Sequence, residues 1–315
     1  MPRLRVIKGG MLTTIQDRGR WGLQSHGIPV AGPMDPCSHR LANALAGNDP
    51  DAATLEVTLV GPELEFDDER VVAVAGAEFE LIVDERPAPV GAFVVAAGSR
   101  LRFGRRGRGA RAYLAIAGGV AVPPVLGSRA THLISGMGGL DGRALKAGDE
   151  LPLGDPRRAR RTLSAPPASP ILMLPDHHAF IRVLPGPQQD YFAGAALDAL
   201  QSAPYTIASH SDRMGFRLDG PPLMHARGAD VISDATPLGV LQVPASGQPI
   251  LLLADRQTTG GYPKIATTIS ADISLAGQLG PSDRISFTVC SPHEAMTALI
   301  AQERALMAVE ASAGR

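Results

Sequence analysis

The sequence predicts a mainly β protein built from two related, barrel-like halves with a few peripheral helices. Its 315 residues include 35 glycines and 27 prolines, which separate short runs of Val, Ile and Leu. Frequent turn formers between short apolar runs are typical of many short strands rather than of a helical bundle. A chain of this length can bury a full core and more often forms two domains than one. We therefore expect an N-terminal half over residues 1–160 and a C-terminal half over 171–315.

The first half is expected to begin with two strands, Leu4–Ile7 and Met11–Ile15, joined by a paired-glycine turn. A long polar loop follows. Asp35 then provides the cap of a helix near residues 36–46, whose apolar positions recur at helical spacing. From residue 54 to 114 short β-branched runs alternate with turns, which predicts a series of antiparallel strands.

A linker and a second strand-rich half are expected after residue 153. The stretch Gly154–Pro170 combines four arginines with four prolines and small polar residues, as linkers often do. The second half is predicted to start with a strand over Phe180–Leu184 and a helix near 190–202. Strands and turns then continue until a final helix near 292–310, which a Ser-x-x-Glu capping box introduces.

Charge and cysteine content argue against several classes of protein. The formal net charge of −1 gives no sign of a nucleic-acid or anionic membrane partner. Cys37 and Cys290 lack CxxC partners, and the adjacent His177 and His178 would point to opposite faces of an extended segment, so no metal site is predicted. The N-terminus lacks the apolar region of a signal peptide, and no apolar run reaches the ~18 residues of a membrane span. We expect a cytoplasmic protein.

The segment Gln248–Asp272, QPILLLADRQTTGGYPKIATTISAD, carries the densest set of candidate functional groups. An apolar strand leads into a loop whose paired glycines permit close backbone approach. This density favours a ligand or interface loop, and an ordinary polar turn is the alternative. The candidate side chains of the loop are Asp255, Arg256, Thr258, Thr259, Tyr262 and Lys264.

A second candidate loop runs from Gln16 to Asp35. A loop of that length inside a compact domain is usually functional or disordered, and its tryptophan and the spacing of its glycines argue against disorder. We expect an ordered binding or interface loop. The alternative is structural packing, in which Trp21 plugs the open end of its own barrel. The candidate residues are Asp17, Arg18, Trp21, Gln24 and His26.

Long motifs follow one another along nearly the whole chain: IQDRGRWGLQSHGIPVAGPMD, ANALAGN, LEVTLVGPELEF, AYLAIAGGV, VLGSRAT, SDRMGFRLDGP, GVLQVPASGQPILLLADRQTTGGYPKIATTISAD and AGQLGPSDRISF. Together they resemble the family of 5-oxoprolinase C subunits, also described as biotin-dependent carboxyltransferase, allophanate hydrolase subunit 2 and kinase-inhibitor antagonist. The resemblance implies a tandem of cyclophilin-like β-barrels, in agreement with the strand-rich pattern.

The resemblance also implies a subunit of an ATP-dependent 5-oxoprolinase, which opens pyroglutamate to glutamate with the A and B subunits of that enzyme as partners. The chain has neither a GxxxxGK[ST] phosphate loop nor a GxSxG nucleophile motif, so we expect ATP, with Mg, to be shared with a partner subunit. Two alternatives remain. One is the carboxyltransferase component of a urea carboxylase or allophanate-type biotin system, although no Met-Lys-Met segment attaches biotin to this chain. The other is a non-enzymatic regulator that antagonises a kinase inhibitor.

A substrate such as 5-oxoproline presents one carboxylate and one lactam. Arg213 or Arg256 could clamp the carboxylate through paired N–H donors. Tyr262 and Lys264 could donate toward a developing oxyanion. Asp255 could act as a base, or form an internal ion pair with Arg256 that braces the loop. The residues that could bind and orient the lactam are Gln242, Thr258 and Thr259.

The N-terminal loop is the expected contact with the B subunit of such an enzyme. Trp and Arg are enriched among the residues that anchor protein interfaces, and this loop holds Trp21 next to Arg20. Gln24 and His26 are then expected to face a cleft shared with the partner.

Overall fold

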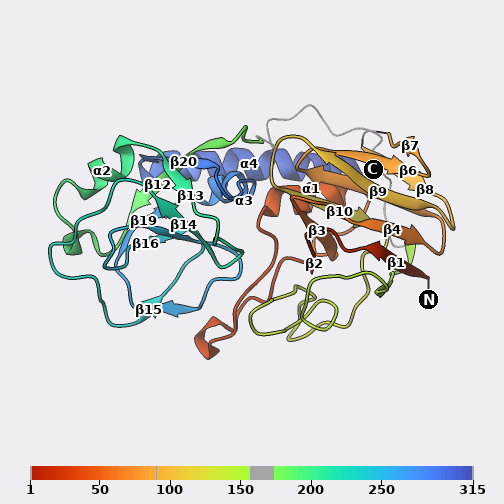
Figure 1. Ribbon diagram of the computed structural model, residues 1–315, viewed down its shortest axis with the longest axis horizontal. Helices are drawn as coiled ribbons and strands as arrows, with labels where there is room; N and C mark the ends of the chain where they lie inside the picture. The colour runs from red at the N-terminus through yellow and green to blue at the C-terminus, as the bar shows by residue number, and fades with distance from the viewer. Residues whose placement is uncertain (1, 90, 157–173, 314–315) are drawn as a thin grey trace. The chain divides into compact units, whose positions relative to one another are not determined.

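The computed structural model describes residues 2–89, 91–156 and 174–313 of the chain (Figure 1). These residues form two compact units. The first takes in the described residues of 1–20, 31–174 and 303–315, and the second those of 21–30 and 175–302. The predicted linker lies mostly within 157–173, outside the described residues. The domain limits at 160 and 171 therefore remain a prediction.

Two antiparallel sheets make up most of the first unit (Figure 1). The six-stranded sheet has the order β11 (Glu150–Pro152), β1 (Arg3–Lys8), β4 (Glu63–Phe66), β9 (Arg100–Arg106), β6 (Phe79–Val83) and β7 (Arg86–Pro87). The five-stranded sheet has the order β2 (Leu12–Gln16), β3 (Thr54–Thr58), β10 (Arg111–Ile116), β5 (Arg70–Gly76) and β8 (Ala92–Val95).

Apolar side chains at alternate positions of the strands point between the two sheets and form one core. Leu4 and Phe66 of the six-stranded sheet and Leu55 and Leu114 of the five-stranded sheet are fully buried in the same cluster. Burial of alternate residues on facing sheets is the usual way in which such sheets exclude water. The first half is thus a curled, two-sheet structure around a single core.

Helix α1 (Pro36–Leu45) covers the other face of the five-stranded sheet. The side chain of Asp35 caps it by accepting a 2.9 Å hydrogen bond from the backbone N–H of Ser38. Leu41 and Leu45 are buried against the sheet. The helix predicted near residues 36–46 is confirmed.

The second unit is a closed seven-stranded barrel. Its strands follow the order β12 (His178–Pro185), β19 (Lys264–Thr268), β16 (Val240–Gln242), β17 (Ile250–Leu252), β14 (Gly215–Asp219), β13 (Tyr205–Ile207) and β20 (Arg284–Val289). β12 and β20 run parallel, and the other neighbours are antiparallel. The barrel interior is filled by side chains such as Ile181, Phe216, Leu251, Ile265 and Phe287, none more than 2% exposed. The predicted class, mainly β with barrel-like halves and few helices, is confirmed.

Short helices pack on two strands of the barrel. α2 (Ala196–Ser202) follows the 3-10 turn Gln189–Tyr191, as predicted near 190–202, and packs on β20. α3 (Ile273–Gly277) follows the 3-10 turn Ser270–Asp272 and was not predicted. Within the described ranges, no helix is both long enough and apolar enough to cross a membrane.

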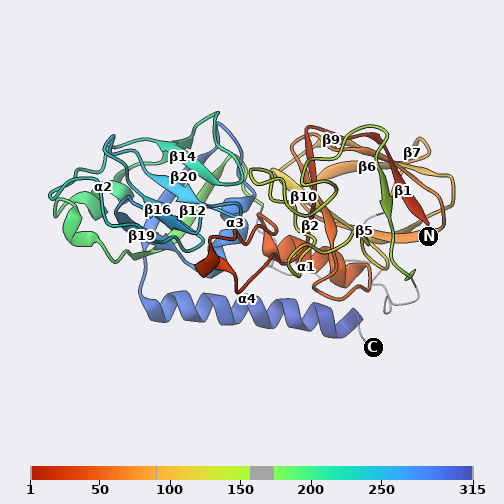
Figure 2. The ribbon, with the colours of Figure 1, turned by 90° about the horizontal axis from the view of Figure 1, so that it is seen from below.

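The final helix, α4 (Pro292–Ala313), is continuous (Figure 2). Its predicted capping box is present: Ser291 Oγ and the backbone N–H of Ser291 donate to the Glu294 carboxylate at 2.8 and 2.7 Å. In the first unit, Arg40 of α1 holds the last turns of α4 through an ion pair with Glu303 at 2.8 Å. The terminal helix predicted near 292–310 is confirmed.

One further element matters for the site. β15 (Asp234–Ala235) and β18 (Thr259–Gly260) pair as a small antiparallel ribbon outside the barrel, with Asp234 opposite Gly260. β15 comes from the segment before β16, and β18 from the loop that follows β17, where the sequence concentrates candidate side chains.

Candidate functional site

The ribbon borders a cavity of about 300 Å³ in the second unit. Part of the N-terminal loop, residues 21–30, belongs to this unit and lines one side of the cavity. The segment after β15 and the start of the loop after β17 line the rest. The lining residues are Trp21, Gln24, Val30, Ala235, Thr236, Pro237, Leu238, Arg256, Gln257 and Thr258. Four predicted site residues therefore meet here, although they come from two distant loops.

Arg256 is the charged residue of this cavity. Its side chain is 8% exposed, with Nε donating to the Thr236 carbonyl at 2.8 Å and Nη1 donating to the Leu253 carbonyl at 3.3 Å. Burial lowers the pKa of Arg256 to about 10, which still leaves the guanidinium protonated near neutral pH. Among the described residues, no carboxylate forms an ion pair with it.

A buried charge is normally paired with an opposite charge, since removing an ion from water is costly. Here two carbonyl dipoles orient Arg256 without neutralising it. Nη2 makes no hydrogen bond to the described part of the chain. This arrangement suits an anionic ligand, because a carboxylate entering the cavity would supply the missing charge and accept from the guanidinium.

Lys264, at the start of β19, lies beside the ribbon rather than in the cavity lining. Its side chain is only 2% exposed, and Nζ donates to Asp234 of β15 at 2.6 Å. The pKa of the Asp234 carboxyl is lowered, mainly by the hydrogen bond from the Lys264 ammonium. The backbone N–H of Ala235 and the Gln188 side chain lower it further. Lys264, predicted as an oxyanion donor, therefore forms an ion pair with Asp234 of the ribbon.

Gln242, predicted to orient the lactam, lies buried beneath the ribbon. Its Nε2 donates to the Tyr262 carbonyl at 3.5 Å and its Oε1 accepts from Gln257 at 3.4 Å. A Cβ on Gly260 would come within 2.6 Å of Gln242 Nε2, so a side chain at this position would displace the Gln242 amide from its place under the ribbon. Gln242 supports the ribbon and contacts the cavity residue Gln257.

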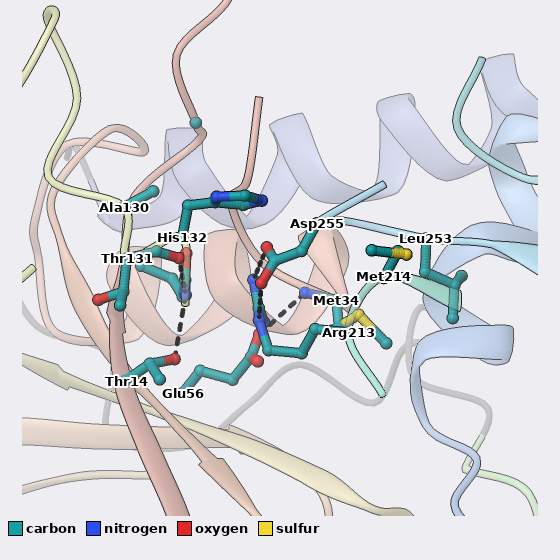
Figure 3. Close-up of polar contacts among 12 residues, drawn as sticks. Thr14, Met34, Glu56, Ala130, Thr131, His132, Arg213, Met214, Leu253 and Asp255 are labelled. Atoms are coloured by element: carbon teal, nitrogen blue, oxygen red, sulfur yellow. Dashed lines mark hydrogen bonds and ion pairs between the residues drawn. The ribbon is translucent and has the colours of Figure 1, made fainter. Parts of the chain in front are cut away.

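Arg213 and Asp255 form a buried ion pair, which Figure 3 shows as two dashed lines between the guanidinium and the carboxylate. Arg213 Nε and Nη2 donate to the two carboxylate oxygens at 3.0 and 2.9 Å, and both side chains are at most 3% exposed. The sequence had suggested a brace between Asp255 and its neighbour Arg256. The ion pair forms instead with Arg213, 42 positions away.

Two other predicted residues of the 248–272 segment lie outside the cavity lining. Tyr262 is 41% exposed. Thr259 is exposed within β18, where it pairs with Ala235. Their roles in catalysis and substrate binding remain predictions.

The predicted residues of the N-terminal loop separate into two groups. Asp17, in the first unit, accepts hydrogen bonds from Ser128 Oγ and the backbone N–H of Arg129, and so fixes a neighbouring loop. Arg18 forms an exposed ion pair with Asp51 at 3.1 Å. Both residues have structural partners within the first unit.

In the second group, Trp21 and Gln24 line the cavity, whereas His26 is exposed outside it. Gln24 and His26 belong to one 3-10 turn, in which Gln24 Oε1 accepts from the backbone N–H of Gly22. Trp21 is 61% exposed, which excludes the alternative of a buried plug in a barrel end.

Sequence reasoning missed three residues that the structure brings to the site: Asp234, Thr236 and Gln257. Asp234 and Thr236 lie within a turn-rich stretch, ISDATPLG, whose composition is typical of an ordinary surface loop. The only available signal was two polar side chains at alternate positions before a proline. Nothing in the sequence connects them to Lys264 or Arg256.

Among the described residues, no group of three or more His, Cys, Asp and Glu side chains is arranged to hold a metal ion. The cavity itself offers one guanidinium, two amides and two hydroxyls, from Arg256, Gln24, Gln257, Thr236 and Thr258. These groups suit a small, singly charged ligand that also forms hydrogen bonds.

Comparison with known proteins agrees with the resemblance. Residues 26–289 match the family model described as carboxyltransferase domain, subdomain A and B. The chain is 42% identical to the C subunit of 5-oxoprolinase from Escherichia coli K12 over 302 residues, covering 96% of each chain. It is 38% identical to the C subunit of 5-oxoprolinase from Haemophilus influenzae over 283 residues, covering 90% of this chain and 89% of the relative.

Among solved structures, the K. lactis urea amidolyase superimposes with a TM-score of 0.90 at 32% identity. The match covers 98% of this chain but only 20% of the amidolyase chain. The likeness thus concerns one region of a much longer protein. By its family model and its two full-length relatives, the chain belongs to the family of 5-oxoprolinase C subunits, which are carboxyltransferase-domain proteins.

Proposed function

We propose that the chain is a subunit of an ATP-dependent 5-oxoprolinase and that its cavity binds the carboxylate of 5-oxoproline through Arg256. The two relatives named as C subunits of 5-oxoprolinase support the activity, since the match extends over nearly all of both chains. The observation that carries the site is the guanidinium of Arg256, 8% exposed, with no carboxylate partner in the described part of the chain.

The other lining groups suit the remainder of such a substrate. With the carboxylate on Arg256, the lactam N–H and C=O could meet Thr258, Gln257 and Gln24. Trp21 supplies a flat apolar wall for the ring. A cavity of about 300 Å³ is at the small end of ligand sites, in keeping with a five-membered ring.

Mg-ATP does not fit this cavity. A triphosphate carries several negative charges, and the lining provides one cation and no glycine-rich phosphate loop. We therefore place the nucleotide mainly on a partner protein and derive no step from it here. The chain would contribute substrate positioning, and catalysis would require the assembled complex. Because the proposed reaction consumes ATP, we place the complex in the cytoplasm.

The A and B subunits of a 5-oxoprolinase are the proposed partners. The relatives are named as one lettered subunit of their enzyme, which implies further subunits in those enzymes. The exposed Trp21 at the cavity supports a contact beside the site, since tryptophan often anchors interfaces. Replacement of Trp21 by Ala should weaken co-purification with the B subunit while leaving the unfolding temperature unchanged. Full co-purification of that variant would rule out the contact.

The test of the proposed activity is reconstitution. The chain is purified alone and together with the products of neighbouring genes, and ATP hydrolysis that depends on 5-oxoproline is measured alongside glutamate formation. We expect activity only in the assembled complex. Activity of the isolated chain would refute the partner requirement, and inactivity of every assembly would refute the proposed reaction.

A carboxyltransferase acting with a biotin protein is the second candidate. It is supported by the description of the family model and by the superposition on the K. lactis urea amidolyase. Adding avidin to the reconstituted assay separates the two candidates. Loss of activity with avidin would favour the biotin system, whereas the 5-oxoprolinase proposal predicts no effect.

A further inference from the structure

We infer that Lys264 is a positioning residue that holds the β15 wall of the cavity through Asp234 and thereby fixes the direction of the Arg256 guanidinium. The inference rests on the proposed carboxylate site. It assigns Lys264 a role different from that of a direct oxyanion donor. The connection runs through three consecutive residues of β15 and the turn after it, Asp234, Ala235 and Thr236.

The first link is the ion pair. Lys264 Nζ lies 2.6 Å from Asp234 Oδ2, with the lysine side chain 2% exposed and the aspartate side chain 56% exposed. The ammonium is thus enclosed by the barrel and ribbon, and its carboxylate sits on a strand of two residues. The backbone N–H of Lys264 also donates to Gln188 Oε1 at 3.2 Å, which fixes the start of β19.

The second link joins β15 to Arg256. The backbone N–H of Thr236 donates to the Thr258 carbonyl at 3.1 Å, and its hydroxyl donates to the Gln257 carbonyl. The Thr236 carbonyl accepts from Arg256 Nε at 2.8 Å. Thr236 therefore fastens the end of β15 to the two residues that follow Arg256 and, through its own carbonyl, to the guanidinium.

The two links explain why a lysine is buried at position 264. A ribbon with two residues in each strand has few hydrogen bonds of its own and would not remain in place alone. A buried ammonium strongly favours keeping its counter-ion, because losing that partner would leave an uncompensated charge. The ion pair thus holds the short strand against the barrel, and with it the carbonyl that directs Arg256.

The test uses Lys264→Met and Asp234→Asn, with Lys264→Arg as the conservative variant. Asp230→Asn is the matched control, because Asp230 is an exposed acid of the same loop with no ion pair among the described residues. If Lys264→Met fails to fold, Asp234→Asn still tests whether the ion pair holds the cavity wall, because it replaces a half-exposed side chain by an isostere.

The first readout is amide hydrogen exchange of the peptides covering 231–238 in the whole chain, which needs no substrate. We expect exchange to become about tenfold faster in Lys264→Met and Asp234→Asn, and to stay unchanged in Lys264→Arg and Asp230→Asn. Unchanged exchange in the first two variants would overturn the inference, whatever the activity of the complex.

The second readout is steady-state kinetics in the reconstituted complex. KM for 5-oxoproline should rise about tenfold with kcat within twofold of the parent, because ligand orientation is lost while the reacting groups remain. A loss confined to kcat would point to direct catalysis by Lys264 and overturn the positioning role. If the unmodified complex does not act on 5-oxoproline, the proposed function fails, and the exchange data alone decide whether the ion pair holds the cavity wall.

Discussion

Replacing Arg256 by Met removes the one charged group of the cavity while keeping a side chain of similar length. The guanidinium contributes two hydrogen bonds to carbonyls, at 2.8 and 3.3 Å, and no ion pair within the described chain. The variant therefore separates the cost of losing a ligand contact from the cost of breaking an internal salt bridge.

The expected magnitude follows from that geometry. A hydrogen bond to a charged group contributes about 1.5–3 kcal/mol, so losing the carboxylate contact should lower kcat/KM for 5-oxoproline about ten- to hundredfold. Stability should change little. The loss of two hydrogen bonds is offset by relief of a buried, unneutralised charge, and we expect the free energy of unfolding to stay within about 2 kcal/mol of the parent.

The assay is initial-rate kinetics of the reconstituted complex, paired with urea unfolding of the chain. Arg217→Met is the control, since Arg217 is an exposed arginine of β14 outside the cavity lining. We expect the control to match the parent in both measurements. An Arg256→Met complex with unchanged kcat/KM would refute the carboxylate site. A loss of much more than about 2 kcal/mol in the free energy of unfolding would show that Arg256 has a structural role.

Three further predictions concern stability. Burial lowers the pKa of His39 to about 4, whereas the imidazole of the unfolded chain protonates near 6.5. The free energy of unfolding should therefore fall by about 2 kcal/mol from pH 7 to pH 5. Urea titrations at the two pH values should show that His39→Gln removes this loss. Gly260→Ala should cost about 1–3 kcal/mol, because its Cβ would meet Gln242 at 2.6 Å, whereas Gly194→Ala, with open space around it, should be neutral in thermal unfolding. Ser291→Ala should destabilise by about 1 kcal/mol through loss of the capping box, and an unchanged unfolding midpoint would contradict the cap.

Local chemistry explains which elements could be predicted from sequence. α1 and α4 each begin with a side-chain cap followed by proline, and such signals act within one turn of the chain. α3 was missed because five residues are too few to show a helical period. The arrangement of the strands as two sheets in one unit and a closed barrel in the other depends on pairing between distant segments, which periodicity alone does not encode.

In the candidate site, too, local sequence signals could be identified, whereas contacts between distant segments could not. The loop after β17 was identified because it concentrates polar side chains beside paired glycines, and Arg256 and Thr258 do line the cavity. The partners of those side chains could not be found. Asp255 pairs with Arg213 and Lys264 with Asp234, at separations of 42 and 30 residues, and both contacts arise only when the barrel closes.

Competitive inhibition by two halves of the substrate tests most directly whether Arg256 recognises a carboxylate. Cyclopentanecarboxylate keeps the ring and the carboxylate, whereas 2-pyrrolidinone keeps the ring and the lactam. Inhibition constants against 5-oxoproline are measured for both compounds in the reconstituted complex containing either the parent chain or Arg256→Met. We predict that Arg256→Met raises the inhibition constant of cyclopentanecarboxylate about tenfold or more and leaves that of 2-pyrrolidinone unchanged. Equal weakening of both inhibitors, or of neither, would contradict the carboxylate site.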